Sequence, residues 1–98
     1  MSNSASQVKL TLYTQKDCVF CEIMKAKLTD WGYDFKVINI SEDISKRAWL
    51  RLQNHRTVPQ LYWNEKHLNK VETSQFTQEI LEAELNYDDY IGGVENWS

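Results

Sequence analysis

The sequence predicts an α/β fold in which about three helices flank a mixed sheet of four strands, and two observations lead to this prediction. An alternating stretch at 8–13, a helical pattern at about 19–31 and a β-rich run at 35–40 follow one another directly, and that order implies a right-handed parallel crossover. Farther along the chain, 58–63 and 67–68 have the pattern of two strands joined by a hairpin turn. The second half of the sheet is therefore expected to begin antiparallel.

Each element has its own local signal. The first strand carries apolar residues at every second position, and the first helix repeats them at helical spacing until Gly32 closes the pattern as a C-terminal cap. Apolar faces predict a second helix at about 44–54, after polar capping residues at 41–43, and a third helix at 73–85. The only proline, Pro59, stands at the beginning of the third strand, where a missing backbone donor is tolerated.

Length and composition fit a single domain over residues 1–98, with a flexible N-terminus at 1–6 and a tail at 87–98. The net charge is −3 and Lys and Arg form no long cluster, so a nucleic-acid partner is not expected. No apolar run approaches the roughly eighteen residues that a membrane span needs, and residues 1–7 show no secretory signal. We expect a cytoplasmic monomer with no membrane partner.

Both cysteines of the chain lie in 14–21, where the first strand gives way to the first helix. Cys18 precedes the first helical turn, so unpaired backbone N–H groups and the positive end of the helix dipole favour its thiolate. Cys21 lies three residues on and can attack a mixed disulfide formed by Cys18, so Cys18 is the expected nucleophile and Cys21 the resolving thiol. A zinc site would need two further ligands, and His55 and His67 stand at spacings that match no common zinc finger, so no metal is expected.

Over residues 8 to about 68 the chain resembles the glutaredoxins, which have the thioredoxin-like fold. Cys18-Val19-Phe20-Cys21 is similar to the Cys-Pro-Tyr-Cys site of that family, and Thr57-Val58-Pro59-Gln60 is identical to its Thr-Val-Pro-Gln loop. Thioredoxins proper carry a tryptophan before the first cysteine, which is absent here, and monothiol glutaredoxins lack the second cysteine. The resemblance implies a thioredoxin-like fold with a cis peptide bond before Pro59, in the loop that precedes the third strand.

The resemblance also implies a glutathione-dependent thiol–disulfide oxidoreductase that reduces protein or mixed glutathione disulfides, with ribonucleotide reductase as a possible target. The Val58 backbone would pair with the cysteine of glutathione and bring the substrate sulfur near Cys18. Gln15, where the family usually has Lys or Arg, would bind the glycine carboxylate of glutathione without a charge, unless Lys16 or Arg56 supplies one. The full expected glutathione site consists of Gln15, Lys16, Phe20, Thr57, Val58, Pro59, Gly93, Val94 and Glu95.

The family's Gly-Gly segment, which receives the γ-glutamyl end of glutathione, has two candidates in this chain. In one alignment 67–72 replaces it without a gap, the third helix follows, and 87–98 is an added tail. In the other, 69–86 is an insertion and 90–95, which contains Gly92-Gly93, is the site. The first alignment keeps a helix over one face of the sheet, whose exposure would cost several kcal/mol at about 25 cal/mol per Å². Both alignments stay open at this point.

Two further functions are consistent with the residues. The acidic, aromatic tail, with Tyr87-Asp88-Asp89-Tyr90 and Trp97, would suit a protein-binding module in which the thioredoxin-like domain presents the tail to a partner. An iron–sulfur or metal carrier that uses Cys18 in a dimer is the other alternative.

Overall fold

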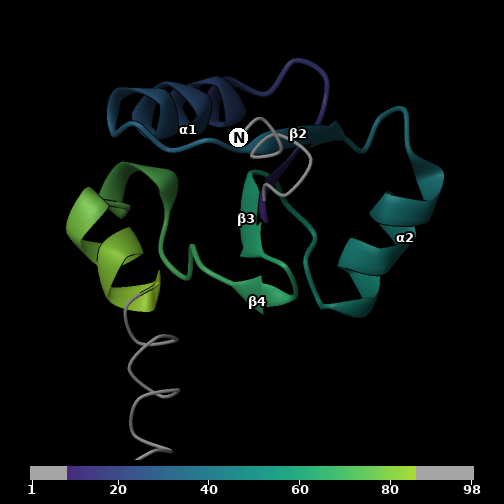
Figure 1. The fold of residues 1–98 in the computed structure, drawn as a ribbon. Coiled ribbons are helices and arrows are strands. Elements are labelled where there is room, and N and C mark those ends of the chain that lie inside the picture. Colours follow the sequence, from purple (N-terminus) through teal and green to yellow (C-terminus); the bar gives the residue numbers. More distant parts are fainter. Residues whose placement is uncertain (1–8, 86–98) are drawn as a thin grey trace, which may run out of the picture.

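The structure, a computed structural model, describes residues 9–85 and forms one sheet with helices packed against both of its faces (Figure 1). The predicted α/β fold is confirmed. A further helix, beyond the named elements, includes residues 78–85. In chain order the named elements are β1 (Leu10–Thr14), α1 (Val19–Asp30), β2 (Lys36–Asn39), α2 (Ile44–Leu52), β3 (Gln60–Trp63), β4 (Lys66–His67) and the 3₁₀ turn η2 (Thr73–Gln75).

The sheet is mixed, with the strand order β2-β1-β3-β4. The central strand β1 pairs in parallel with β2, where Leu12 lies opposite Val37, and antiparallel with β3, where Leu12 lies opposite Leu61. β4 pairs antiparallel with β3, where His67 lies opposite Tyr62. All five residues of β1 are buried, so the strand that leads to the cysteines is the most enclosed part of the sheet.

The helix ends follow the local signals in the sequence. Gly32 adopts a φ of 83°, which suits a glycine, and Tyr33 N–H donates to the Leu28 carbonyl at 3.0 Å, as in a Schellman cap. At the beginning of α2, the Asp43 carboxylate accepts a hydrogen bond from Lys46 N–H at 3.1 Å. The same hydrogen bond holds the pKa of Asp43 below its usual value.

The core consists of two clusters, one on each face of the sheet. Alternation along β1 and β3 sends one set of side chains toward α1 and the 78–85 helix and the other set toward α2, because successive side chains of a strand point to opposite faces. The first cluster is apolar throughout, whereas the second contains two tyrosines. Their buried members are Leu10, Leu12, Met24, Leu28, Leu61, Leu68, Phe76 and Leu81 in the first cluster, and Tyr13, Ile40, Leu50 and Tyr62 in the second.

The predicted third helix at 73–85 is wrong in its first turn. The chain forms the short turn η2, then runs extended through Phe76, and begins a helix only at residue 78. Thr77 caps this helix, because its Oγ1 accepts a hydrogen bond from Ile80 N–H at 3.2 Å. The Phe76 ring lies in the first core cluster, 6.0 Å from the Trp31 ring. Apolar residues at helical spacing therefore do not show where the helix begins, because Phe76 is buried although it precedes the helix.

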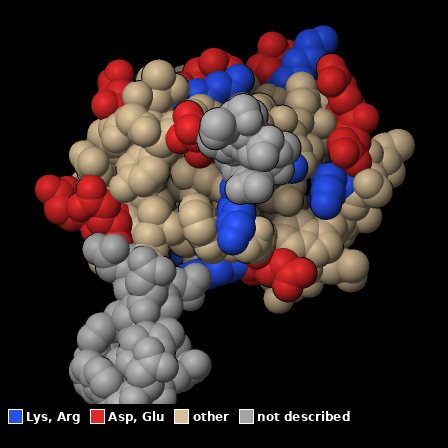
Figure 2. All heavy atoms as spheres, viewed as in Figure 1, with Lys and Arg blue, Asp and Glu red and all other residues tan. Residues whose placement is uncertain are grey.

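The surface of the described residues is mixed in charge. On the face shown in Figure 2, acidic and basic side chains are interspersed. None of the helices within residues 9–85 has the length and apolar character needed to cross a membrane. The N-terminus predicted to be flexible, at 1–6, and the predicted tail, at 87–98, lie outside the described residues.

Phe76→Ala is expected to lower the free energy of unfolding by about 3–5 kcal/mol, because a fully buried ring leaves a cavity behind it. Phe20→Ala is the matched control, since Phe20 is 57% exposed and its loss should cost less than about 1 kcal/mol. Urea denaturation followed by circular dichroism measures both values. Equal losses of unfolding free energy in the two variants would contradict the contribution of Phe76 to the first core cluster.

Candidate active site

The cysteine pair lies at the N-terminus of α1, where Cys18 and Cys21 are joined as a disulfide with their Cα atoms 5.2 Å apart. Cys18 is the N-cap residue, and its Sγ accepts a hydrogen bond from the backbone N–H of Cys21 at 3.1 Å. Cys21 is 1% exposed, whereas Cys18 is half-buried. Cys18 is therefore the sulfur that an incoming group can reach, and it lies at the positive end of the helix dipole.

The loop that leads from β1 to Cys18 is held by a hydrogen bond to the chain after β2. Lys16 N–H donates to the Ser41 hydroxyl at 3.0 Å, which ties the loop to the chain that follows β2. Asp17 adopts a φ of 59°, a left-handed conformation that Asp tolerates better than most residues, and this turns the chain into α1. Gln15 and Lys16 are both exposed, and neither lines the pocket described below.

The Thr57–Gln60 loop faces the cysteine pair. The peptide bond between Val58 and Pro59 is cis, as the resemblance implied. The Val58 carbonyl oxygen lies 4.0 Å from Cys18 Sγ. Pro59 is buried, whereas Val58 is half-buried. The Val58 backbone is therefore partly accessible beside the Cys18 sulfur.

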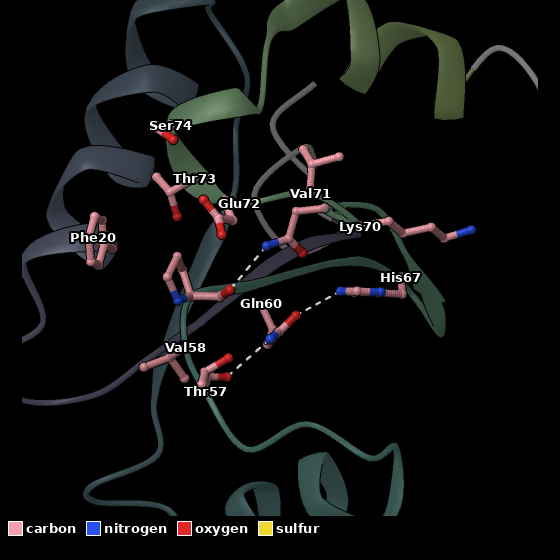
Figure 3. Close-up of a pocket in the computed structure, with 12 residues that line it drawn as sticks. Phe20, Thr57, Val58, Gln60, His67, Lys70, Val71, Glu72, Thr73 and Ser74 are labelled. Atoms are coloured by element: carbon pink, nitrogen blue, oxygen red, sulfur yellow. Dashed lines mark hydrogen bonds between the residues drawn. The ribbon is translucent and has the colours of Figure 1, made fainter.

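A pocket of about 620 Å³ opens beside this loop (Figure 3). Four of the expected glutathione-site residues line it. Three others, Gly93, Val94 and Glu95, lie outside the described residues, as do Gly92 and the tail proposed for partner binding. The residues that line the pocket are Phe20, Thr57, Val58, Pro59, Gln60, His67, Asn69, Lys70, Val71, Glu72, Thr73 and Ser74.

The chain just after β4 supplies the far side of the pocket, and it does so without filling it. Asn69 is 7% exposed, its Oδ1 accepts from Leu61 N–H at 2.8 Å, and its Nδ2 donates to the Pro59 carbonyl at 3.0 Å. In Figure 3 the Lys70 side chain extends away from Phe20. The two side chains that replace glycines in the gap-free alignment therefore leave the space beside Pro59 open.

Two polar side chains that line the pocket, Gln60 and His67, were not among the predicted site residues. Gln60 Nε2 donates to the Thr57 carbonyl at 3.0 Å, which leaves Oε1 to accept from His67 Nε2 at 2.7 Å. The His67 ring lies 4.5 Å from the His55 ring, and His55 Nε2 is 2.6 Å from the Tyr62 hydroxyl. Gln60 and His67 are diagonal neighbours on one face of the hairpin, because His67 lies opposite Tyr62 and Gln60 is two residues from Tyr62 along β3. The predicted hairpin was the only signal in the sequence for this contact.

Burial lowers the pKa of both histidines. For His67 the second cause is the positive charge that His55 would carry, because the two rings are adjacent. For His55 burial is the cause. Within residues 9–85, no three His, Cys, Asp or Glu side chains are grouped so that they could hold a metal ion.

A family model described as glutaredoxin matches residues 10–68 of this chain, a stretch that contains the cysteine pair and the cis-proline loop. The chain belongs to the glutaredoxin family. The match ends one residue before Asn69, so the chain that forms the far side of the pocket follows the matched region. The family assignment therefore covers the reactive side of the pocket and not the opposite side.

Known relatives include the glutaredoxin-like protein NrdH of Escherichia coli (strain K12), which is 35% identical over 52 residues. That match covers 53% of this chain and 64% of the relative, less than two thirds of its length. A solved structure of the NrdH-redoxin from Escherichia coli, described as having a thioredoxin-like activity profile, is 34% identical with a TM-score of 0.53, over 54% of this chain and 70% of that chain.

A solved structure of a thioredoxin-like protein also matches, with a TM-score of 0.62 and 22% identity. The match covers 74% of this chain and all of that chain, 100%. At this identity the likeness shows the fold alone. It agrees with the thioredoxin-like fold that the resemblance implied.

The free energy of unfolding is expected to fall as the pH drops below about 6.5, the ordinary histidine pKa. Both histidines have lowered pKa values in the folded state, so the unfolded chain binds protons first as the pH falls. The stabilisation is complete above the unfolded pKa and is lost as the pH falls through the folded one. Urea denaturation at a series of pH values between 7.5 and 4.5 measures it.

The double variant His55→Gln/His67→Gln should show a flatter dependence over this range. Lys25→Gln, which changes an exposed side chain paired with Glu22, is the control and should keep the wild-type slope. If the double variant keeps the full slope, other groups cause it.

Proposed function

We propose that this chain is a thiol–disulfide oxidoreductase in which Cys18 attacks a substrate disulfide and Cys21 resolves the intermediate. One observation carries this proposal. The reachable sulfur of the pair belongs to Cys18, which caps α1 and lies 4.0 Å from the Val58 carbonyl, while Cys21 is enclosed three residues behind it. Two-step disulfide exchange requires an accessible nucleophile and a second thiol within reach of it, and Cys18 and Cys21 meet both conditions.

The reaction balances as follows. In the reduced pair, the Cys18 thiolate attacks one sulfur of the substrate disulfide, and the other substrate sulfur leaves as a thiolate that takes a proton from water. The Cys21 thiolate then attacks Cys18 Sγ, releases the second substrate thiolate, and forms the Cys18–Cys21 bond present in the structure. Two electrons pass from the pair to the substrate. The Cys21 N–H that points at Cys18 Sγ stabilises negative charge on that sulfur.

Glutathione is the reductant that we propose for the oxidised pair. Two molecules return it to the dithiol and leave as glutathione disulfide. Support comes from the pocket of about 620 Å³ beside the Val58 backbone, which Asn69 and Lys70 leave open. The proposed site comprises Phe20, Thr57, Val58 and Pro59 at the pocket, Gln15 and Lys16 at the loop before Cys18, and Gly93, Val94 and Glu95 if the second alignment holds.

A protein dithiol is the alternative reductant, and one feature of the chain favours it. Gln15 brings no positive charge to the place where the family usually has one, which weakens the attraction for a glutathione carboxylate. The Escherichia coli NrdH-redoxin, described as having a thioredoxin-like activity profile, points the same way. The substrates we propose are protein and mixed glutathione disulfides, with ribonucleotide reductase as the target implied by the family resemblance, in a reducing cytoplasm.

Cys18→Ser is expected to reduce turnover of a protein disulfide to the uncatalysed background, because no thiolate is left to begin the exchange. Cys21→Ser should lose protein-disulfide reduction but still exchange with mixed glutathione disulfides, since glutathione can resolve the Cys18 intermediate. An NADPH-coupled assay with insulin and with a glutathionylated peptide measures both. Full activity of Cys18→Ser together with inactivity of Cys21→Ser would reverse the assigned roles.

The same assay separates the two reductants. Turnover with glutathione and glutathione reductase supports the glutathione site. Turnover that requires thioredoxin reductase, with none from glutathione, overturns the glutathione part and leaves the oxidoreductase assignment standing. Lys25→Gln is again the control, because its side chain lies on α1 in an exposed ion pair with Glu22.

A further inference from the structure

The chain from 69 to 76, which we call the far wall, closes the pocket opposite the cis-proline loop and follows the part that the family model matches. We propose that Asn69 and Lys27 are positioning residues that fix the two ends of the far wall, and that they thereby determine how tightly the pocket holds the non-reacting part of a disulfide substrate. This inference rests on the oxidoreductase function proposed above. Neither residue reacts.

Asn69 anchors the beginning of the far wall to the sheet. The main-chain ladder between β3 and its partner strand continues to the hydrogen bond from Leu68 N–H to the Leu61 carbonyl, at 2.9 Å. Beyond that point the Asn69 side chain makes the hydrogen bonds to β3 and the loop before it: its Oδ1 accepts from Leu61 N–H, and its Nδ2 donates to the Pro59 carbonyl. Both halves of the amide are used and the group is buried, so either bond left unmade would cost the desolvation of a backbone group.

Lys27 anchors the end of the far wall to α1, the helix that carries the cysteines. Its ammonium donates to the Thr73 carbonyl at 2.6 Å and to the Phe76 carbonyl at 2.8 Å, on either side of η2. Because a partly buried cation donates them, both are charge-assisted hydrogen bonds, and such bonds are stronger than hydrogen bonds between neutral groups. They join residues 46 and 49 positions apart in the chain, so the far wall cannot move away from α1 while they are intact.

Between the two anchors, Lys70, Val71 and Glu72 are exposed and belong to no helix or strand. Figure 3 shows Glu72 and Thr73 over the pocket, on the side toward Phe20. The separation between these side chains and the Val58 backbone therefore depends on the Asn69 anchor at the sheet and on the Lys27 anchor on α1. A substrate that fills the pocket needs the wall in place, whereas a small disulfide that only reaches Cys18 does not.

The test follows single-turnover oxidation of the reduced protein by glutathione disulfide and by bis(2-hydroxyethyl) disulfide. Lys27→Met keeps most of the side-chain stem and removes the two hydrogen bonds. We expect its half-saturating concentration of glutathione disulfide to rise about tenfold, the equivalent of one or two ordinary hydrogen bonds, with an unchanged maximal rate and an unchanged rate for the small disulfide. Lys27→Arg should recover most of the loss. Lys25→Met, on the same helix, is the control.

A second readout does not depend on glutathione. In Asn69→Leu, the Leu61 amide loses its acceptor, so its hydrogen exchange should become faster than in the wild type and in Lys25→Met. If wild-type oxidation does not saturate with glutathione disulfide, the glutathione part of the proposed function fails, and this exchange measurement alone decides the role of the anchor.

Two results would overturn the inference. One is a Lys27→Met variant without the selective effect: an unchanged half-saturating concentration of glutathione disulfide shows that the Lys27 anchor does not act on the pocket, and equally slowed reactions with both disulfides report a general loss of folded protein and not a displaced wall. The other is a Leu61 amide that exchanges at the wild-type rate in Asn69→Leu.

Discussion

The antiparallel pairing of β1 with β3 is the interaction on which the rest of the structure depends. Its register places Tyr13 opposite Gln60, so the carboxyl end of β1 and the amino end of β3 lie at the same edge of the sheet. The cysteine pair follows the first of these ends and the cis-proline precedes the second. Cys18 and Val58, separated by 40 positions in the chain, are thereby brought within 4.0 Å. The pairing therefore brings the two halves of the site together.

The two sides of the pocket are held in place by different kinds of interaction. The side nearest the cysteines is made of backbone held by the sheet, and it lies within the residues that the family model matches. The far side is irregular chain held by individual side chains, and it follows those residues. A segment of this kind can change in sequence as long as each end keeps an anchor, because the pocket uses its position and not its regular structure. Under the gap-free alignment, in which Asn69 and Lys70 stand in place of the family's two glycines, the pocket remains open for that reason.

The polar cluster beneath the cis-proline loop links the site to the second core cluster. Gln60 joins the Thr57 carbonyl to His67, and the paired histidines lie against Tyr62, which packs on Tyr13 and Trp49. Every polar side-chain atom that is fully buried among residues 9–85 has a hydrogen-bond partner. A satisfied network of this kind is rigid because each unmade bond would be costly in the low-dielectric interior. It therefore holds the loop that faces Cys18 in place.

Local patterns in the sequence were sufficient to predict the succession of strands and helices, the parallel first crossover, the cap at Gly32 and a polar cap within 41–43, because these depend on residues within a turn or on alternation along one strand. Three features could not be predicted in this way: the helix begins only at residue 78, after Phe76, the Asn69 side chain bonds to the sheet, and the Lys27 side chain reaches the far wall. These contacts join distant parts of the chain, as in the 46 positions between Lys27 and Thr73. A side chain's direction there depends on what the fold places beside it, which local pattern does not encode.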